Sequence, residues 1–205
     1  MPLELITIEH AAHPEQLTQP AESVTFPLSV EDSELIAEMK KKVLQLNGVG
    51  LAAPQIGISK QIIVYVISED AKGIRQDANE VIPVTVLLNP SYVPTEDAEI
   101  VYDWEACFSV NNTTGKVPRY SKIHYTAKTL DGSTIEATVQ GFTARVLQHE
   151  IDHIQGILIT HRLTPDCVQG HPNDMMALRI SELSATQRDI LSKMIHQREE
   201  NLKNK

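Results

Sequence analysis

Apolar residues recur at helical spacing in three stretches of the chain. The first follows two acidic residues, is ended by Asn47-Gly48, and has its apolar positions at Leu35, Ile36, Met39, Val43, Leu44 and Leu46. The second runs from Thr143 to Ile154, and the third from Ser181 to Asn201. This period places apolar side chains on one face of a helix. The sequence therefore predicts an N-terminal helix, a central helix and a long C-terminal helix over 181–205.

Runs of β-branched and aromatic residues predict strands between these helices. They lie at 61–67, 84–88, 99–104, 122–130 and 133–140, with Asp131-Gly132 as a hairpin signal between the last two. Residues 68–80 are polar and predict an exposed loop, and four prolines in residues 1–30 predict an irregular N-terminal arm. We expect one domain over residues 1–205, of the α+β class, with mainly antiparallel sheets packed around the central helix.

The composition narrows the function by exclusion. The 205 residues carry a net charge of −9, which argues against a broad nucleic-acid groove. The two cysteines do not make a disulfide framework. The first residues do not resemble a signal peptide, and no stretch approaches the roughly 20 apolar residues that cross a bilayer. We therefore expect a cytoplasmic protein without membrane contact.

The segment His149-Glu150-Ile151-Asp152-His153 carries the strongest chemical signal. Residues i and i+4 of a helix share one face, so both imidazoles can bind one metal ion while Glu150 takes a proton from a water on that ion. The pattern predicts a metal-dependent hydrolase. Asp152 is either a solvated charge or a group that orients an imidazole. The third ligand stays open at this point, and it decides the kind of hydrolase.

Two cysteines are candidates for the missing ligand. Cys107 is either a small buried residue or a thiolate that completes a Cys-His-His site with one open position. Cys167, with His161 and His171 near it in sequence, is a weaker candidate. We interpret Cys167 and these two histidines as surface or packing residues.

A third island, from Gly48 to Gln55, is rich in small residues. Small residues in such density indicate close approach of the backbone to a strand or a ligand. The island forms either a tight turn after the helix, or a backbone edge that pairs with an extended peptide. In the second case Gln55 can reach the reacting oxygen.

Together the three islands resemble the peptide deformylase family, whose signatures are G-x-G-L-A-A-P-Q, E-G-C-x-S and H-E-x-D-H. Here they stand, in the same order, as Gly48 to Gln55, Glu105 to Ser109 and His149 to His153. Val117-Pro118-Arg119 and the Asp131-Gly132 hairpin are also similar to the family, and the resemblance spans the chain from the N-terminal arm to just beyond the central helix. It implies hydrolytic removal of the N-formyl group from the initiator methionine of nascent chains.

The resemblance also implies roles for individual residues. Cys107, His149 and His153 would bind the metal, natively Fe(II) and replaceable by Zn(II), Ni(II) or Co(II). Glu150 would be the general base and then the acid, and the oxyanion donors would be Gln55 and the backbone N–H of Phe108. The substrate would contact Val49, Gly50, Ala106, Phe142 and Val146. The partners would be formylated nascent peptides, with a possible transient ribosome contact. The net charge of about +1 on the C-terminal helix gives that contact little support, and the apolar stripe of the helix favours packing on the domain instead.

The sequence departs from the family at three places. Ala106 replaces a glycine, which adds strain if the backbone there has positive φ and otherwise narrows the cleft. Phe108 stands where leucine is common, and residues 111–114 replace a stretch that often holds proline and arginine, so we expect an altered substrate pocket. Two other functions stay open. One is a zinc endopeptidase with His161 or Glu182 as third ligand, and the other is a non-catalytic protein that binds formyl-methionine.

Overall fold

Helices and strands follow one another without a repeating unit. The computed structural model describes residues 3–10 and 12–203. Its helices are α1 (Glu15–Thr18), α2 (Val30–Gln45), η1 (Ala53–Ile56, a 3-10 helix), α3 (Glu69–Ile74), α4 (Gly141–Ile154), α5 (Ile159–Arg162), α6 (Pro172–Glu182) and α7 (Ala185–Lys203). Its strands are β1 (Gly50–Ala52), β2 (Ile62–Ile67), β3 (Ile82–Pro94), β4 (Ile100–Cys107), β5 (Val110–Tyr120), β6 (Lys122–Lys128), β7 (Thr134–Gln140) and β8 (Gln169–Gly170).

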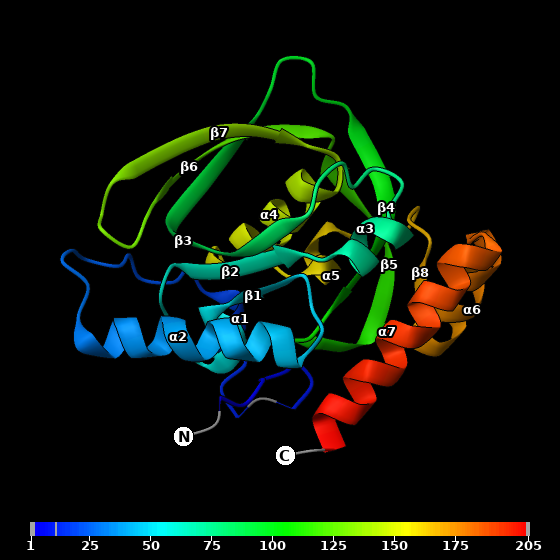
Figure 1. Ribbon diagram of the computed structural model, residues 1–205, viewed down its shortest axis with the longest axis horizontal. Coiled ribbons are helices and arrows are strands. Elements are labelled where there is room, and N and C mark those ends of the chain that lie inside the picture. The colour runs from blue at the N-terminus through cyan, green and yellow to red at the C-terminus, as the bar shows by residue number, and fades with distance from the viewer. Residues whose placement is uncertain (1–2, 11, 204–205) are drawn as a thin grey trace.

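The strands form two antiparallel sheets. One has the order β1-β2-β3-β6-β7 and the other the order β4-β5-β8. The central helix α4 contacts both, and Figure 1 shows it enclosed between the large sheet and the β4–β5 pair. The predicted α+β class, with mainly antiparallel sheets around the central helix, is confirmed.

The helix α4 is buried on nearly all sides. Only Gly141 and His149 among its residues retain partial exposure. Its apolar residues Val146, Leu147 and Ile151 join the core cluster that also holds side chains of the five-stranded sheet. Because a buried polar group costs free energy unless it has a partner, the polar side chains of this helix must bind either other protein groups or a ligand.

The N-terminal arm is largely irregular, as predicted, apart from the short helix α1. It is nonetheless tied to the rest of the domain. The backbone N–H of Ile6 donates to the carbonyl of Gln55 at 2.9 Å, and that of Ile8 donates to the carbonyl of Ser109 at 2.9 Å. The arm therefore links two of the sequence motifs, because it bonds to the last residue of the Gly48–Gln55 motif and to the last residue of the Glu105–Ser109 motif.

The prediction of an exposed loop over residues 68–80 is wrong in its first half. This stretch contains α3, in which Ala71 and Ile74 are buried. Ser68 begins the helix because its side chain accepts a hydrogen bond from the backbone N–H of Ala71 at 3.1 Å. The two buried residues are three positions apart and so lie on one face, a spacing too short to stand out among charged neighbours.

The predicted long C-terminal helix is present as α7, but it begins four residues later than the predicted start at Ser181, and residues 204–205 lie outside the described residues. The helix α6 ends at Glu182, Leu183 has an extended backbone, and α7 begins at Ala185. Ser184 and Gln187 form a reciprocal cap at this break, with the Gln187 N–H donating to the Ser184 hydroxyl and the Ser184 N–H donating to the Gln187 side chain. The two helices can therefore turn against one another, and they reach different parts of the domain.

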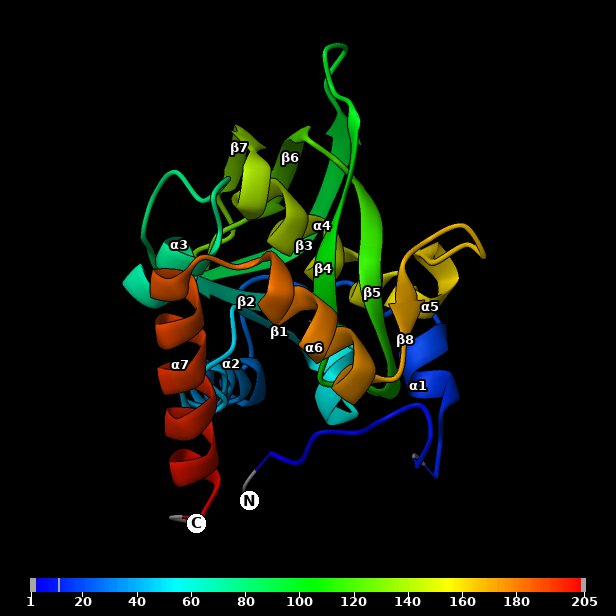
Figure 2. The same cartoon turned by 90° about the vertical axis from the view of Figure 1, so that its right-hand side faces the viewer.

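The two C-terminal helices cover one side of the molecule. In Figure 2, α6 crosses in front of β4, while α7 runs beside α2 and α3. The contacts of α7 are with these two helices, and those of α6 are with β5 and β8. Within the part of the chain that the structure describes, no helix combines the length and apolarity that a membrane span requires.

Candidate metal centre and catalytic cleft

Three side chains that can bind a metal converge where the end of β4 meets α4. The Sγ atom of Cys107 lies 3.2 Å from Nε2 of His153, which itself lies 3.2 Å from Nε2 of His149. The candidate ligand atoms of the three residues all lie within 4.8 Å of one another. A thiolate and two imidazoles suit Zn(II) and similar divalent ions, and three protein ligands leave one position for water or substrate. The donor set therefore fits a catalytic metal ion.

Glu105 orients His149. It lies two residues before Cys107 in β4, so both side chains point toward α4. Its Oε2 atom lies 2.8 Å from Nδ1 of His149, which leaves Nε2 of that ring directed at the candidate centre. Arg119 donates two hydrogen bonds of 2.9 Å to the Glu105 carboxylate, and Arg145 donates one of 2.7 Å.

The charge of Glu105 is fixed by these partners. Burial acts to raise its pKa, but the charge of Arg119 and the hydrogen bond with His149 outweigh burial and hold the pKa well below its usual range. A carboxylate that stays ionised accepts the Nδ1 hydrogen of His149 at any pH near neutrality. The tautomer that can bind a metal through Nε2 is therefore stabilised.

Asp152 does not bond to Glu105 itself but to Arg119, the partner of Glu105. It is 1% exposed, so it is not a solvated charge. Its hydrogen bonds go to Arg119 and, at 2.9 and 2.6 Å, to Arg162, so it does not orient an imidazole directly. Asp152 holds Arg119, which in turn holds Glu105. The arginines of this network were not foreseen as site residues, and the one available signal was Arg119 within the Val-Pro-Arg match.

Glu150 lies beside the three candidate ligands and lacks a partner on one oxygen. It is 3% exposed, and its Oε2 atom is buried without a hydrogen bond in the described structure. Burial raises the pKa of Glu150 to about 7, against the opposing charge of His149. A carboxyl group with a pKa near neutrality can both accept and return a proton.

The absence of a side chain at Gly50 leaves space for the side chain of Glu150. A Cβ atom at this glycine would lie 2.1 Å from Oε1 of Glu150. The strand β1 is at the edge of its sheet, because β2 is its only neighbour there among the described residues. Its backbone therefore has a free side next to the Glu150 carboxylate, as required for pairing with an extended peptide. This outcome favours the peptide-edge interpretation of the Gly48 island.

Gln55 and Phe108 both lie next to Cys107. Gln55 is 1% exposed, and its carbonyl oxygen accepts from the Ala52 N–H at 2.8 Å, which turns its amide nitrogen toward the Cys107 sulfur at 3.8 Å. Phe108 follows Cys107 directly, and its ring packs against the backbone of Gly48. Both residues thus border the candidate metal centre.

These groups open into one cleft of ≈ 500 Å³, a volume suited to a small ligand or the end of a peptide. All five predicted substrate contacts line it, namely Val49, Gly50, Ala106, Phe142 and Val146. Ala106 is absent from the residues with positive φ. Its methyl group therefore adds no backbone strain, and the replacement of glycine narrows the cleft instead.

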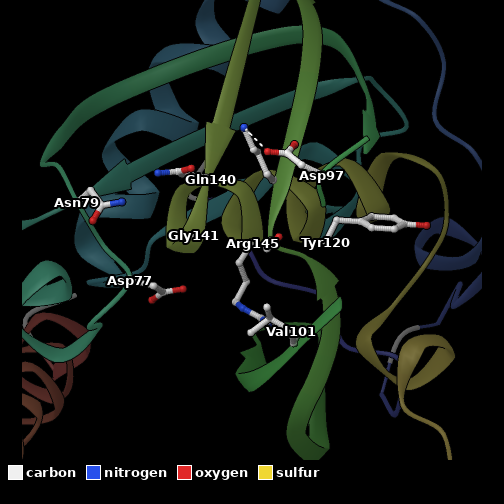
Figure 3. Close-up of a pocket in the computed structure, with 10 residues that line it drawn as sticks. Asp77, Asn79, Asp97, Val101, Tyr120, Gln140, Gly141 and Arg145 are labelled. Atoms are coloured by element: carbon white, nitrogen blue, oxygen red, sulfur yellow. Dashed lines mark hydrogen bonds and ion pairs between the residues drawn. The ribbon is translucent and has the colours of Figure 1, made fainter. Parts of the chain in front are cut away.

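A second cavity of ≈ 360 Å³ lies on the other side of Arg145 (Figure 3). Most of its lining residues are polar, and three of the charged ones, Asp97, Lys122 and Arg145, have partners. Lys122 donates to Asp97 at 2.8 Å, and the guanidinium of Arg145 donates to Glu105 and to backbone carbonyls of β4 and β5. This cavity contains none of the candidate ligands, and Arg145 forms the partition between it and the catalytic cleft.

The weaker candidates from the sequence lie elsewhere and have structural partners. Nδ1 of His161 accepts from the Leu158 N–H at 2.9 Å, and the His171 side chain caps α6. Cys167 is buried, in agreement with a packing role. Glu182 accepts hydrogen bonds from Trp104 and Lys116. Neither downstream candidate therefore joins the two histidines, which removes the basis for an endopeptidase site.

Comparisons with known proteins agree with this geometry. The family model described as polypeptide deformylase matches residues 4–169. The chain is 46% identical over 148 residues to peptide deformylase 2 of Rickettsia conorii, covering 71% of this chain and 73% of that protein. It is 42% identical over 148 residues to peptide deformylase 1 of Nitrosomonas europaea, covering 72% and 81%.

Solved structures give the same result. The actinonin-bound class I type b peptide deformylase from Acinetobacter baumannii superposes with a TM-score of 0.66 at 30% identity, covering 80% of this chain and 99% of that one. The Met-Ala-Ser-bound form of that enzyme gives a TM-score of 0.67 at 29% identity, with the same coverage. The chain belongs to the peptide deformylase family.

Proposed function

We propose that this enzyme removes the N-formyl group from formyl-methionyl nascent peptides through a divalent ion held by Cys107, His149 and His153. One observation supports this assignment above all others. A set of three convergent ligand atoms lies beside a buried carboxylate, Glu150, that has one oxygen without a partner. Such a carboxylate needs a ligand or a water to satisfy it, and the free edge of β1 supplies a binding place for the peptide that bears the formyl group.

Each residue of the site has its own role in the proposed reaction. When bound, the divalent ion supplies a water of lowered pKa and polarises the formyl oxygen. Glu150 would take a proton from the attacking water and pass it to the leaving amine. Gln55 and the backbone N–H of Phe108 donate hydrogen bonds to the oxyanion, each worth about 3 kcal/mol to the transition state.

The substrate is held by backbone and apolar contacts. The backbone of Gly50 and of Ala106 pairs with the extended peptide, while Val49, Phe142 and Val146 surround the methionine side chain. The position of all five around the cleft supports these roles. The narrowing at Ala106 favours an unbranched side chain in this place.

We infer that Fe(II) is the native ion and that Zn(II), Ni(II) or Co(II) can replace it. The mixed thiolate and imidazole set accepts each of these ions. Metal analysis of anaerobically purified protein, together with a formate-release assay, tests the ion and the reaction at once. An Fe(II)-thiolate site should lose activity in air as the thiolate oxidises, whereas a zinc-loaded sample should not lose its metal in this way.

The substitution Glu150→Ala tests the assignment of the base. We expect the variant to keep its bound metal and to release no formate from formyl-Met peptides. Turnover at the rate of the unaltered enzyme would contradict the mechanism. Absence of formate release from the unaltered, metal-loaded enzyme would instead favour a protein that only binds formyl-methionine.

The cytoplasm and a transient ribosome contact remain predictions. Residues 196–205, which include the charged end of α7, are the candidate anchor, although α7 also packs on α2 and α3. Co-sedimentation with ribosomes after deletion of residues 196–205 distinguishes the two roles. Retained co-sedimentation would exclude the helix end as the anchor.

A further inference from the structure

The C-terminal helices form one wall of the catalytic cleft. The family model ends at residue 169, so both α6 and α7 lie beyond the matched region. They nevertheless contribute to the lining that also holds the candidate metal ligands Cys107 and His149, through Met176, Arg179, Leu191, Met194, Ile195 and Arg198. The shape and charge of this wall therefore belong to this chain rather than to the segment that it shares with the family.

Arg198 lies at the mouth of the cleft, over Phe108. Its guanidinium carbon is 4.8 Å from the centre of the Phe108 ring. Within the described residues it makes no hydrogen bond and no ion pair, although every N–H of a guanidinium is a donor. Stacking on an aromatic face restrains a guanidinium while leaving its donors free at the edge.

The position of Arg198 is fixed from two sides. The side chain of Asn47 donates to the carbonyl of Met194 at 3.2 Å, and that of Asn201 donates to the carbonyl of Gln45 at 3.2 Å. These bonds flank Arg198 along α7 and tie the helix to the end of α2. The guanidinium is thus held beside the start of β1.

Arg198 lies on the path that a bound peptide takes away from the metal. Gly50 touches Glu150, and Gly48 touches the Phe108 ring on which Arg198 stacks. Gly48 lies two residues before Gly50, in the segment that leads into β1, and so borders the approach to the catalytic carboxylate. A peptide paired along β1 with its formyl group at the metal brings its second or third residue to this point.

The charges of the cleft favour an acidic group there. Glu105 is neutralised by three hydrogen-bonded partners, and Arg75 is paired with Asp103 at 2.6 Å. Within the described residues, Arg179 in the same lining makes no ion pair with a carboxylate, and burial, followed by repulsion from Arg75, lowers its pKa to about 10. In a chain whose net charge is −9, this cleft carries cations without carboxylate partners.

We propose that Arg198 is a specificity-determining residue, which binds the carboxylate of an aspartate or glutamate at the second or third position of the formylated chain. The inference rests on the deformylase activity proposed above. A planar guanidinium donates two parallel hydrogen bonds to a carboxylate, which gives both affinity and geometry. Since this contact is remote from the formyl bond, it strengthens binding of substrate and transition state alike and is expressed in KM rather than in kcat.

Peptide pairs that differ only by Asp and Asn test the proposal. The substrates are formyl-Met-Asp-Ser-amide against formyl-Met-Asn-Ser-amide, and formyl-Met-Ser-Asp-amide against formyl-Met-Ser-Asn-amide. The terminal amides remove the other carboxylate. We expect the metal-loaded enzyme to show a kcat/KM ratio of Asp to Asn of about tenfold at one of the two positions, which is the effect of one partly exposed charged contact. The ratio should fall as salt is added.

The substitution Arg198→Gln should reduce that ratio to near one, because the KM for the Asp peptide should rise while kcat is unchanged. Arg198→Lys should retain part of the ratio. Arg188→Gln is the matched control, because it removes the same charge from an exposed position of α7 that does not line the cleft. It should leave the ratio as in the unaltered enzyme. A ratio near one for the unaltered enzyme at both positions, or an unchanged ratio in Arg198→Gln, would overturn the proposal. Failure to release formate from any of the peptides would instead refute the deformylase activity itself.

Discussion

Replacement of Gly50 by alanine separates catalysis from folding in this enzyme. The added Cβ atom would lie 2.1 Å from Oε1 of Glu150, 2.5 Å from its Cδ and 2.7 Å from its Cγ. Comfortable contact begins at 3.4 Å, so the carboxylate must retreat by about 1.3 Å. The atoms that move are the end of a flexible side chain, and Gly50 does not have the positive φ that excludes alanine. The backbone can therefore keep its course.

A shift of this size is large for a proton-transfer group. Misplacement of a catalytic group by about 1 Å can cost about 100-fold in rate, which corresponds to about 2.7 kcal/mol in the activation free energy. We expect Gly50→Ala to lower kcat for formyl-Met-Ala-Ser by about that factor. The midpoint of thermal unfolding should change by no more than a few degrees, and the bound metal should remain, because the three atoms nearest to the added Cβ all belong to Glu150 and not to a candidate ligand.

The assay measures formate release under anaerobic conditions, with metal content determined on the same sample. Gly73→Ala is the matched control. A Cβ at Gly73 would lie 2.8 Å from Cδ1 of Ile190, which is again the end of a flexible side chain, but it touches no catalytic group. Full activity in Gly50→Ala would refute the assignment of Glu150 as the base in its observed position. Equal loss in both variants would attribute the effect to general disturbance.

Three further substitutions probe the supports of the site. Glu105→Gln should weaken metal binding about 10- to 100-fold, measured by competition with a chelator, because the neutral amide no longer fixes the tautomer of His149; unchanged affinity would contradict the orienting role. Cys107→Ser should abolish tight metal binding, whereas Cys167→Ser should leave it intact. Tight metal binding in Cys107→Ser together with its loss in Cys167→Ser would refute the ligand assignment. Gly156→Ala should lower the free energy of unfolding by at least about 1 kcal/mol, seen as a fall of about 2–4 °C or more in Tm, since this residue has a φ of +74° and its Cβ would lie 2.6 Å from backbone. An unchanged Tm in Gly156→Ala would contradict the expected strain at this position.

Much of the fold could be predicted because its signals are local. The helix α2, the strand β2, the β6–β7 hairpin with its Asp131-Gly132 turn, and α4 each follow from a period or a turn signal contained within a few residues. The break before α7 was also local, since Ser184 and Gln187 form a cap of ordinary spacing. It was missed because the apolar stripe on both sides of it continues with helical period.

The candidate centre was predictable for a different reason. His149, Glu150 and His153 share one helix face, so their proximity is set by helix geometry alone. Cys107 was placed with them by resemblance to a family, since nothing in the intervening sequence dictates which loop returns to a helix. The structure brings its sulfur within 3.2 Å of His153.

The sequence by itself thus determined the helix that carries two candidate ligands and a candidate base, the one hairpin whose two strands pair, and the chemistry that these residue types allow. The tertiary structure alone decided that Glu105 would hold His149, that Arg119 and Asp152 would hold Glu105, and that Arg198 would reach the mouth of the cleft. The physical reason is the range of the interactions. Hydrogen-bonded turns and side-chain periods act over a few residues, whereas the partner of a buried charge is chosen by the packing of elements that are far apart along the chain.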